Sequence, residues 1–255
     1  MCDLDGVIYR GDEPVGGAAD AVSALRGSGI RIVFCTNNSR STVSQYVEKL
    51  AAVGLDVAPA EIVTSAVVTA EVLVAEGFAG ARAFVVGGDG IRSCLAEAEI
   101  VIDDSHGEPP ALVVVGWDPT FSYDEMRRAV LAVRAGARLV ATNDDASFPA
   151  PDGLWPGAGA ILASIETASD VSAEVMGKPH PPMMETVARR LDGAKDIAMV
   201  GDRPDTDLAG GAALGWRTIL VLSGVTTEAE AATVTPRPDL VLPSLADLPP
   251  LVIAS

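Results

Sequence analysis

Short apolar runs alternate with helical stretches along this chain, and that alternation limits the folds open to it more than any other feature. Apolar residues recur at helical spacing over 15–29, and a strand-like run follows at 30–35. Another helical stretch covers 42–53, and 62–76 begins as a strand and continues as a helix. Strands and helices that alternate over short connections form a parallel sheet covered by helices on both faces. The sequence therefore predicts an α/β fold whose ligands bind beyond the carboxyl ends of the strands.

The same alternation starts again in the middle of the chain. The middle stretches are strands at 83–87, 111–117 and 138–142, helices at 90–98 and 123–135, and polar, turn-rich segments at 103–110 and 144–156. The first rhythm returns near the end, with helices at 182–191 and 206–214 and strands at 197–200 and 218–222. We therefore expect a core made of residues 1–80 and 175–255, with residues 81–174 as an inserted domain.

A pair of carboxylates, Asp3 and Asp5, stands at the end of the first apolar run and is followed by Gly6. Side chains on a regular strand alternate between faces, so both acids reach one end of the strand only if the backbone bends, which Gly6 allows. Two carboxylates and a carbonyl around one small volume suit a hard cation such as Mg²⁺ and make Asp3 a nucleophile toward phosphorus. A solvated acidic turn is the other interpretation of this motif alone. Only Met1 and Cys2 precede Asp3, so the strand is shorter than the usual length of about five or six residues.

Three later stretches carry groups that would complete such a site. An apolar run ends at Thr36 and Asn37, which supply a hydroxyl and amide donors for phosphate oxygens. Lys178 stands before a proline, and a further apolar run leads into Asp202 and Asp207. In chain order the four motifs offer a nucleophile, a hydroxyl, a lysine and an acidic pair.

These motifs, read as DLDGVIYRG, FCTNNS, GKP and GDRPDTD, make the chain similar to the haloacid dehalogenase (HAD) superfamily. It resembles the type IIA phosphatases in particular, which include p-nitrophenyl-phosphatase-like, phosphoglycolate-phosphatase-like and nucleotide-phosphatase-like enzymes. The resemblance covers nearly the whole chain. It implies an α/β fold with a HAD-like, Rossmann-type parallel-sheet core and an inserted α/β cap of the C2 type. It also implies Mg²⁺-dependent hydrolysis of a small phosphate monoester.

The resemblance assigns the catalytic and metal-binding roles to four acids. Asp3 would attack phosphorus to form an aspartyl-phosphate, and Asp5 would act as general acid and then as general base. Mg²⁺ would be held by a carboxylate oxygen of Asp3, the backbone carbonyl of Asp5 and Asp202. Asp207 would act in the outer shell of the metal.

The resemblance assigns phosphate binding to Thr36, Asn37 and Lys178. Thr36 and Asn37 would contact the phosphoryl oxygens, and Lys178 would offset the negative charge of Asp3 and the phosphoryl group. Without the other motifs, Thr36 and Asn37 would equally well cap the following helix, and Lys178 would be a surface charge.

The inserted domain is expected to contact the leaving group of the substrate. The stretch from Asn143 and Asp144 to the turn of Gly157 and Gly159 resembles the cap specificity loop of the phosphoglycolate, glycerol-phosphate and p-nitrophenyl-phosphate members. We expect these residues to approach the active site when the cap is closed. The alternative is an ordinary polar loop.

The charge of the chain limits its partners. A formal charge of −17 and a pI near 4.3 argue against nucleic acid or an anionic membrane, since both would require a basic surface. A small anionic metabolite remains a suitable partner because a bound cation and Lys178 would reverse the local charge. No apolar run approaches the roughly 20 residues of a membrane span, so we expect a cytoplasmic protein.

Two other functions fit parts of this pattern. A phospho-accepting receiver module also combines acids, a threonine and a lysine on a parallel sheet, but lacks the Asp-x-Asp-Gly arrangement. A catalytically weak or inert HAD-like relative would bind ligands without turnover. The sequence leaves open which monoester is hydrolysed, and a homodimer formed through the cap rests on resemblance alone.

Overall fold

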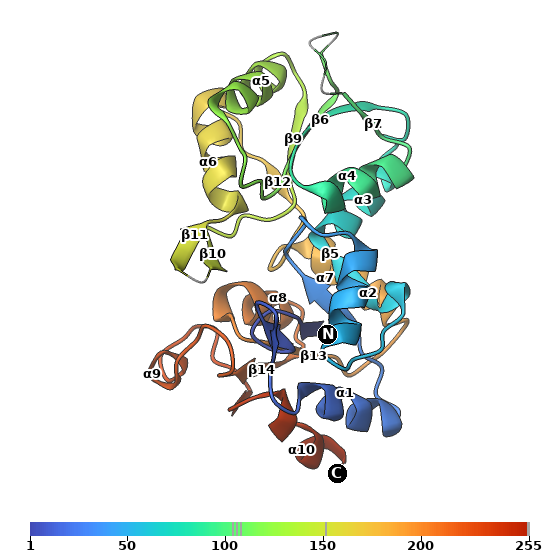
Figure 1. Ribbon diagram of the computed structural model, residues 1–255, viewed down its shortest axis with the longest axis vertical. Coiled ribbons are helices and arrows are strands. Elements are labelled where there is room, and N and C mark those ends of the chain that lie inside the picture. Colours follow the sequence, from blue (N-terminus) through green and yellow to red (C-terminus); the bar gives the residue numbers. More distant parts are fainter. Residues whose placement is uncertain (104, 106, 108, 151, 254–255) are drawn as a thin grey trace. The chain divides into compact units, whose positions relative to one another are not determined.

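The computed structural model describes residues 1–103, 105, 107, 109–150 and 152–253, and the chain divides into two units (Figure 1). The first unit comprises Met1–Thr36, Ser44–Val63 and Lys178–Ser255. The second comprises Asn37–Val43 and Thr64–Gly177. The predicted insertion, 81–174, falls inside the second unit, which also takes in the segment that directly follows Thr36.

The first unit is built on a six-stranded sheet with the order β15-β14-β13-β1-β4-β5. Its strands are β1 (Cys2–Asp3), β4 (Phe34–Thr36), β5 (Ile62–Thr64), β13 (Ala198–Gly201), β14 (Arg217–Val221) and β15 (Leu240–Leu242). The strand pairings from β15 through to β4 are all parallel, which confirms the predicted parallel α/β sheet. Although β1 has only two residues, it lies between β13 and β4 and pairs with both.

The first unit also contains helices, and a small hairpin follows β1. The helices are α1 (Ala18–Gly27), α2 (Val43–Ala52), α7 (Pro181–Arg190), α8 (Ala209–Ala213), α9 (Glu228–Ala231) and α10 (Pro249–Ile253). The hairpin pairs β2 (Tyr9–Arg10) with β3 (Glu13–Pro14), and single 3₁₀ turns cover Pro59–Glu61 and Leu245–Asp247. Helix α1 buries Val22 and Leu25, the apolar residues whose spacing predicted it. None of the helices in the described residues combines the length and apolar character needed to cross a membrane.

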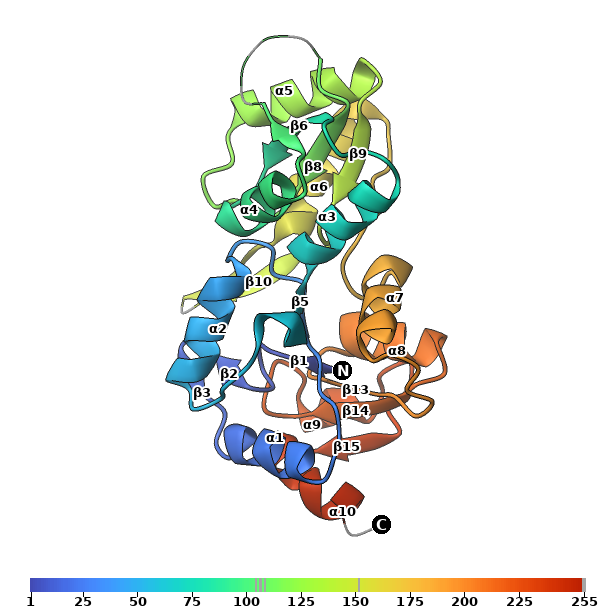
Figure 2. The same cartoon turned by 90° about the vertical axis from the view of Figure 1, so that its right-hand side faces the viewer.

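The second unit has its own five-stranded parallel sheet, with the order β12-β9-β8-β6-β7. Its strands are β6 (Arg82–Val86), β7 (Val101–Ile102), β8 (Leu112–Val115), β9 (Arg138–Ala141) and β12 (Glu174–Val175). Helices α5 (Tyr123–Arg134) and α6 (Ala158–Ser169) share a buried core with alternate residues of β6, β8 and β9. Helices α3 (Ser65–Ala75) and α4 (Asp89–Glu97) pack on each other, and Figure 2 shows them on the opposite face of this sheet.

The segment predicted as a polar loop at 144–156 contains a β-hairpin. Strands β10 (Ser147–Ala150) and β11 (Gly153–Pro156) pair antiparallel outside the main sheets. Residues distant in sequence stabilise it: the Trp117 ring stacks on Phe148 with centroids 4.9 Å apart, and the Trp117 Nε1 donates to the Pro156 carbonyl at 3.0 Å. The loop prediction was wrong there because it used only the polarity of the segment itself, which does not reveal contacts with distant residues.

The structure also differs from the single helix predicted over 206–214. The chain first forms a π-helical turn, η2 (Pro204–Leu208), and only then enters α8. Such π-helical turns occur frequently at functional sites. Here the turn places the Asp207 side chain back beneath the end of β13, where its Oδ2 accepts the Asp202 and Arg203 amides at 3.2 and 3.0 Å.

Candidate active site

Asp3 lies at the carboxyl end of the central strand β1, between two strands that also end in polar residues. Cys2 is in register with Phe34 of β4 and with Val200 of β13. Thr36, the last residue of β4, and Asp202, the residue just after β13, therefore reach the same edge of the sheet as Asp3. All three side chains are buried.

The turn after β1 depends on Gly6. Its φ of +77° belongs to the left-handed region, which glycine adopts without steric cost. A Cβ built on Gly6 would stand 2.4 Å from the Asp202 Oδ2, so any other residue here would displace that carboxylate. The Gly6 amide donates to the Tyr9 carbonyl at 2.7 Å, which closes the turn.

Three carboxylates, those of Asp3, Asp202 and Asp207, form a compact buried cluster. Each offers an oxygen atom, and these atoms lie within 4.8 Å of one another. Lys178 donates from its Nζ to Asp3 Oδ1 at 2.5 Å and to Asp207 Oδ1 at 2.7 Å, and the residue is only 2% exposed. Three carboxylates and one ammonium leave a formal charge of −2, which one divalent cation would neutralise. An all-oxygen donor set suits a hard cation.

Burial of this cluster shifts the pKa values of its members. Burial raises the pKa of Asp3 well above its ordinary value, against the opposing effect of Lys178. Burial also raises the pKa of Asp202 to about 6, and the nearby Asp207 adds to the shift. Burial alone would lower the pKa of Lys178, but the carboxylates of Asp207 and Asp3 outweigh it and hold that pKa well above the usual range. Lys178 is therefore charged, and the carboxylates need further positive charge to ionise fully.

Hydrogen bonds from a neighbouring loop fix the Asp202 carboxylate. The Val225 amide donates to Asp202 Oδ2 at 2.7 Å, and the Thr226 hydroxyl donates to the Asp202 carbonyl at 2.6 Å. Positioned this way, the carboxylate has one orientation in which to meet a cation.

Asp5 occupies a different environment from the three clustered acids. Its side chain is partly buried, and burial raises its pKa, opposed by Lys49 and Lys178. A raised pKa keeps the proton on a carboxyl group closer to neutral pH, as a general acid requires. Asp5 is thus set apart from the clustered acids by its partial exposure and its position outside the carboxylate cluster.

Helix α2 contributes two residues that the sequence motifs did not identify. Tyr46 shares a side-chain hydrogen bond with Thr36, and the Nζ of Lys49 lies 3.9 Å from the centroid of the Tyr9 ring. Tyr46 and Lys49 stand three residues apart, so they share a face of the helix. This spacing was the only sign in the sequence that Tyr46 and Lys49 lie together, and it does not show which other element they contact.

The predicted cap residues lie together in the second unit, and Asn37 joins them. The Asn143 Nδ2 donates to the Asn37 carbonyl at 2.7 Å, and the Asn37 Nδ2 donates to Asp145 Oδ2 at 3.1 Å. The Gly159 amide donates to the Asp145 carbonyl at 2.9 Å. Asp144 is exposed, and its carbonyl would stand 2.2 Å from a Cβ built on Gly159. In the same loop, the Gly157 amide donates to the Ala146 carbonyl.

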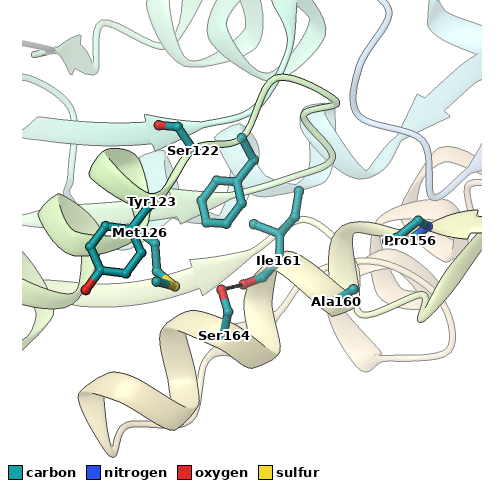
Figure 3. Close-up of a pocket in the computed structure, with 8 residues that line it drawn as sticks. Ser122, Tyr123, Met126, Pro156, Ala160, Ile161 and Ser164 are labelled. Atoms are coloured by element: carbon teal, nitrogen blue, oxygen red, sulfur yellow. Dashed lines mark hydrogen bonds between the residues drawn. The ribbon is translucent and has the colours of Figure 1, made fainter.

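A separate cavity of about 360 Å³ opens between α5 and α6 in the second unit (Figure 3). Apolar side chains and two serines line it, and none of its lining residues is charged: Phe121, Ser122, Tyr123, Met126, Pro156, Ala160, Ile161 and Ser164. It offers no charged group to neutralise a phosphate ester or to activate a serine hydroxyl. We therefore place the chemistry at the carboxylate cluster.

Comparison with known proteins agrees with this geometry. The profile described as haloacid dehalogenase-like hydrolase matches residues 1–101, and a second HAD-like hydrolase profile matches residues 175–248. An acid sugar phosphatase of Staphylococcus aureus is 39% identical over 89% of this chain and 87% of its own length.

Solved structures give the same family. The p-nitrophenyl phosphatase from Archaeoglobus fulgidus superposes with a TM-score of 0.92 at 34% identity, covering 99% of this chain and 98% of that one. A glycerol phosphate phosphatase from Mycobacterium tuberculosis, solved in complex with magnesium, superposes with a TM-score of 0.88 at 33% identity, covering 96% of this chain and 74% of that one. With its carboxylate cluster at the edge of a parallel sheet, the chain belongs to the haloacid dehalogenase-like hydrolase family.

Proposed function

We propose that this protein is a Mg²⁺-dependent phosphatase that hydrolyses a small phosphate monoester through an aspartyl-phosphate on Asp3. The observation that carries the proposal is the buried cluster of Asp3, Asp202 and Asp207 with Lys178 bound between Asp3 and Asp207. Uncatalysed hydrolysis of phosphate monoesters is extremely slow, so the site must offset phosphoryl charge and hold the nucleophile in line. This cluster supplies both functions.

The residues present fit a magnesium ion. Asp3 and Asp202 would hold it together with the backbone carbonyl of Asp5, and Asp207 would act in the outer shell. The ion would supply positive charge to the phosphoryl oxygens. The burial of Asp3 and Asp202 supports this assignment, because buried carboxylates that share a single lysine with Asp207 need further positive charge.

The protein's own groups would carry out two displacements. In the first, an oxygen of Asp3, oriented by Lys178, attacks phosphorus in line while Asp5 protonates the departing alcohol. In the second, Asp5 takes a proton from water, which attacks phosphorus and releases Asp3 and inorganic phosphate. Thr36 and Asn37 would bind the phosphoryl oxygens throughout.

The second unit would act as the cap that selects the leaving group. The relatives are named for sugar phosphates, p-nitrophenyl phosphate and glycerol phosphate, so we propose a small phosphorylated sugar or polyol as substrate. Asp144 and the turn of Gly157 and Gly159 are the groups proposed to face it. A homodimer formed through the cap and a cytoplasmic location remain predictions from the sequence.

Phosphate release tests this proposal. We would assay p-nitrophenyl phosphate and a panel of sugar and polyol phosphates with Mg²⁺ and with EDTA, comparing the parent with Asp3→Asn. Turnover should require Mg²⁺ and fall at least about 10³-fold in Asp3→Asn. Asp205→Asn is the matched control, because the Asp205 side chain is 72% exposed. EDTA-resistant turnover, or an active Asp3→Asn, would overturn the proposal.

A further inference from the structure

The segment Asn37–Val43 lies where an open parallel sheet ordinarily binds a ligand. Strands β6, β8 and β9 of the second unit end at Val86, Val115 and Ala141, and ligands of such sheets bind beyond these carboxyl ends. Here the chain itself occupies that edge: the Gly90 amide, at the start of α4, donates to the Arg40 carbonyl at 2.7 Å. The segment that follows Thr36 is therefore held by the second unit.

The strongest contacts converge on one atom, the carbonyl oxygen of Asn37. The Asn143 Nδ2 donates to it at 2.7 Å and the Ser65 hydroxyl at 2.6 Å. A carbonyl oxygen has two lone pairs, so these two donors satisfy it fully. Asn143 and Ser65 are 4% and 0% exposed, which makes both bonds inaccessible to competing water.

Packing around this peptide leaves no spare room. A Cβ built on Gly177 would stand 2.6 Å from both the Asn37 Oδ1 and the Thr142 carbonyl. A further bond joins the hydroxyls of Ser39 and Thr142 at 2.9 Å. The peptide after Thr36 is thus fixed by side chains from α3 and from the end of β9, and Gly177 leaves the room that the peptide needs.

The Asn143 side chain forms its hydrogen bonds with Asn37, Thr142 and Asp145. Its Nδ2 donates to the Asn37 carbonyl and, at 3.4 Å, to the Thr142 hydroxyl, and its Oδ1 accepts the Asp145 amide at 3.2 Å. Both amide hydrogens are committed, so the side chain has no donor left for a substrate. This bonding argues against the substrate contact expected for Asn143 from the sequence.

We propose that Asn143 and Ser65 are positioning residues that orient the phosphate-binding peptide at Thr36 and Asn37 by holding the Asn37 carbonyl. This inference rests on the proposed function, because it assumes that this peptide binds phosphoryl oxygens. Asn143 and Ser65 would then act on the binding of the phosphoryl group, which all phosphate monoesters share. Loss of either residue should therefore weaken the binding of every substrate by a similar factor, whatever its leaving group.

Asn143→Asp tests the role of the donor. Aspartate keeps the shape of the side chain and an oxygen for the Asp145 amide but has no hydrogen to donate to the Asn37 carbonyl. Ser65→Ala removes the second donor and gives an independent test if Asn143→Asp fails to fold. Ser93→Ala is the control, because the Ser93 hydroxyl donates to the exposed Glu97 in the same helix.

The measurements are the inhibition constant of inorganic phosphate and kcat/KM for p-nitrophenyl phosphate and several sugar and polyol phosphates. We expect each variant to raise the phosphate inhibition constant about tenfold and to lower kcat/KM for all substrates by a similar factor. The ranking of substrates and the Ser93→Ala values should stay unchanged. Inorganic phosphate has no leaving group, so this readout separates positioning from direct substrate contact.

Two results would overturn the inference alone. One is an active parent whose variants keep the parental phosphate inhibition constant. The other is a variant whose substrate ranking changes while phosphate binding does not, which would make Asn143 a leaving-group contact. A parent without Mg²⁺-dependent turnover would instead overturn the proposed function, and this inference with it.

Discussion

The Lys178 ammonium lies between two buried carboxylates, so its removal should destabilise the fold as well as the chemistry. Lys178→Met keeps the apolar stem but leaves Asp3 and Asp207 without their common partner. Breaking a buried ion pair from one side costs about 3–5 kcal/mol of the free energy of unfolding. Urea denaturation in EDTA should show this loss.

Lys195→Met serves as the control for that measurement, because Lys195 is exposed. It should change the free energy of unfolding by less than about 0.5 kcal/mol. Equal stability of the two variants would mean that Lys178 does not hold the carboxylate cluster together.

The separate environment of Asp5 predicts a dependence on the leaving group. Asp5→Asn removes the proton donor, which matters for a sugar or polyol alcohol but little for p-nitrophenolate, a stable anion. We expect kcat for a sugar phosphate to fall about 10²–10⁴-fold and kcat for p-nitrophenyl phosphate to fall much less, in steady-state assays where formation of the aspartyl-phosphate limits the rate. An equal loss with both substrates would contradict the general-acid role.

At this scale, the motifs predicted which acids and which lysine would gather, because the acids stand at or just after the ends of β1 and β13 in one parallel sheet. The sequence could not show that Tyr46 and Lys49 lie near Thr36 and Asp5, because they do so only through the packing of α2. It also could not reveal the partner of Asn143. A carbonyl oxygen 106 positions away has no side-chain signature.

Among the elements, the turn after β1 has the tightest steric requirement. Gly6→Ala should add the strain of a left-handed backbone, about 1–2 kcal/mol, and should also push the Asp202 carboxylate out of place. We expect weaker stability together with a higher Mg²⁺ concentration for half-maximal activity.

Gly29→Ala separates these two effects. Gly29 has a similar φ of +86°, but a Cβ there would have no neighbour within 4 Å. It should therefore lose stability through strain and keep the parental Mg²⁺ requirement. A normal Mg²⁺ requirement in Gly6→Ala would show that Asp202 tolerates the displacement.

The elements themselves were largely predictable, because strands and helices alternate with clear periodicity. Strand β1 forms despite its two residues because β13 and β4 supply partners on both sides. The hairpin β10–β11 and the π-helical turn η2 were not predictable. The hairpin depends on Trp117, and the turn is accompanied by hydrogen bonds that the Asp202 and Arg203 amides donate to the Asp207 carboxylate.

For the molecule as a whole, the buried carboxylates predict how stability responds to pH and Mg²⁺. The pKa of Asp202, about 6, exceeds the ordinary aspartate value of about 3.9, so the folded protein binds this proton more tightly than the unfolded chain does. The contribution of Asp202 to stability therefore falls as the pH rises from about 4 to about 6, the interval between the two pKa values. Magnesium should offset the loss, so its stabilising effect should grow with pH.

Differential scanning calorimetry of the parent and Asp202→Asn, in EDTA and in Mg²⁺, checks this expectation. Between about pH 5 and pH 7.5, the parent in EDTA should lose Tm relative to Asp202→Asn. The Mg²⁺-induced rise in Tm of the parent should be larger at the higher pH. A Mg²⁺ effect that shrinks with rising pH would contradict the assignment of Asp202 to the cation.

Residues 37–43 are bound at the edge of the second sheet, and this also determines how chimeras of this enzyme and its relatives should be built. A graft that exchanges only residues 64–177 would bring foreign counterparts of Ser65, Thr142 and Asn143 onto the native loop. Junctions placed on both sides of residues 37–43 would keep the loop with the surface that binds it. The transplantable module is therefore two stretches of chain, and a library that shuffles substrate preference must inherit them together.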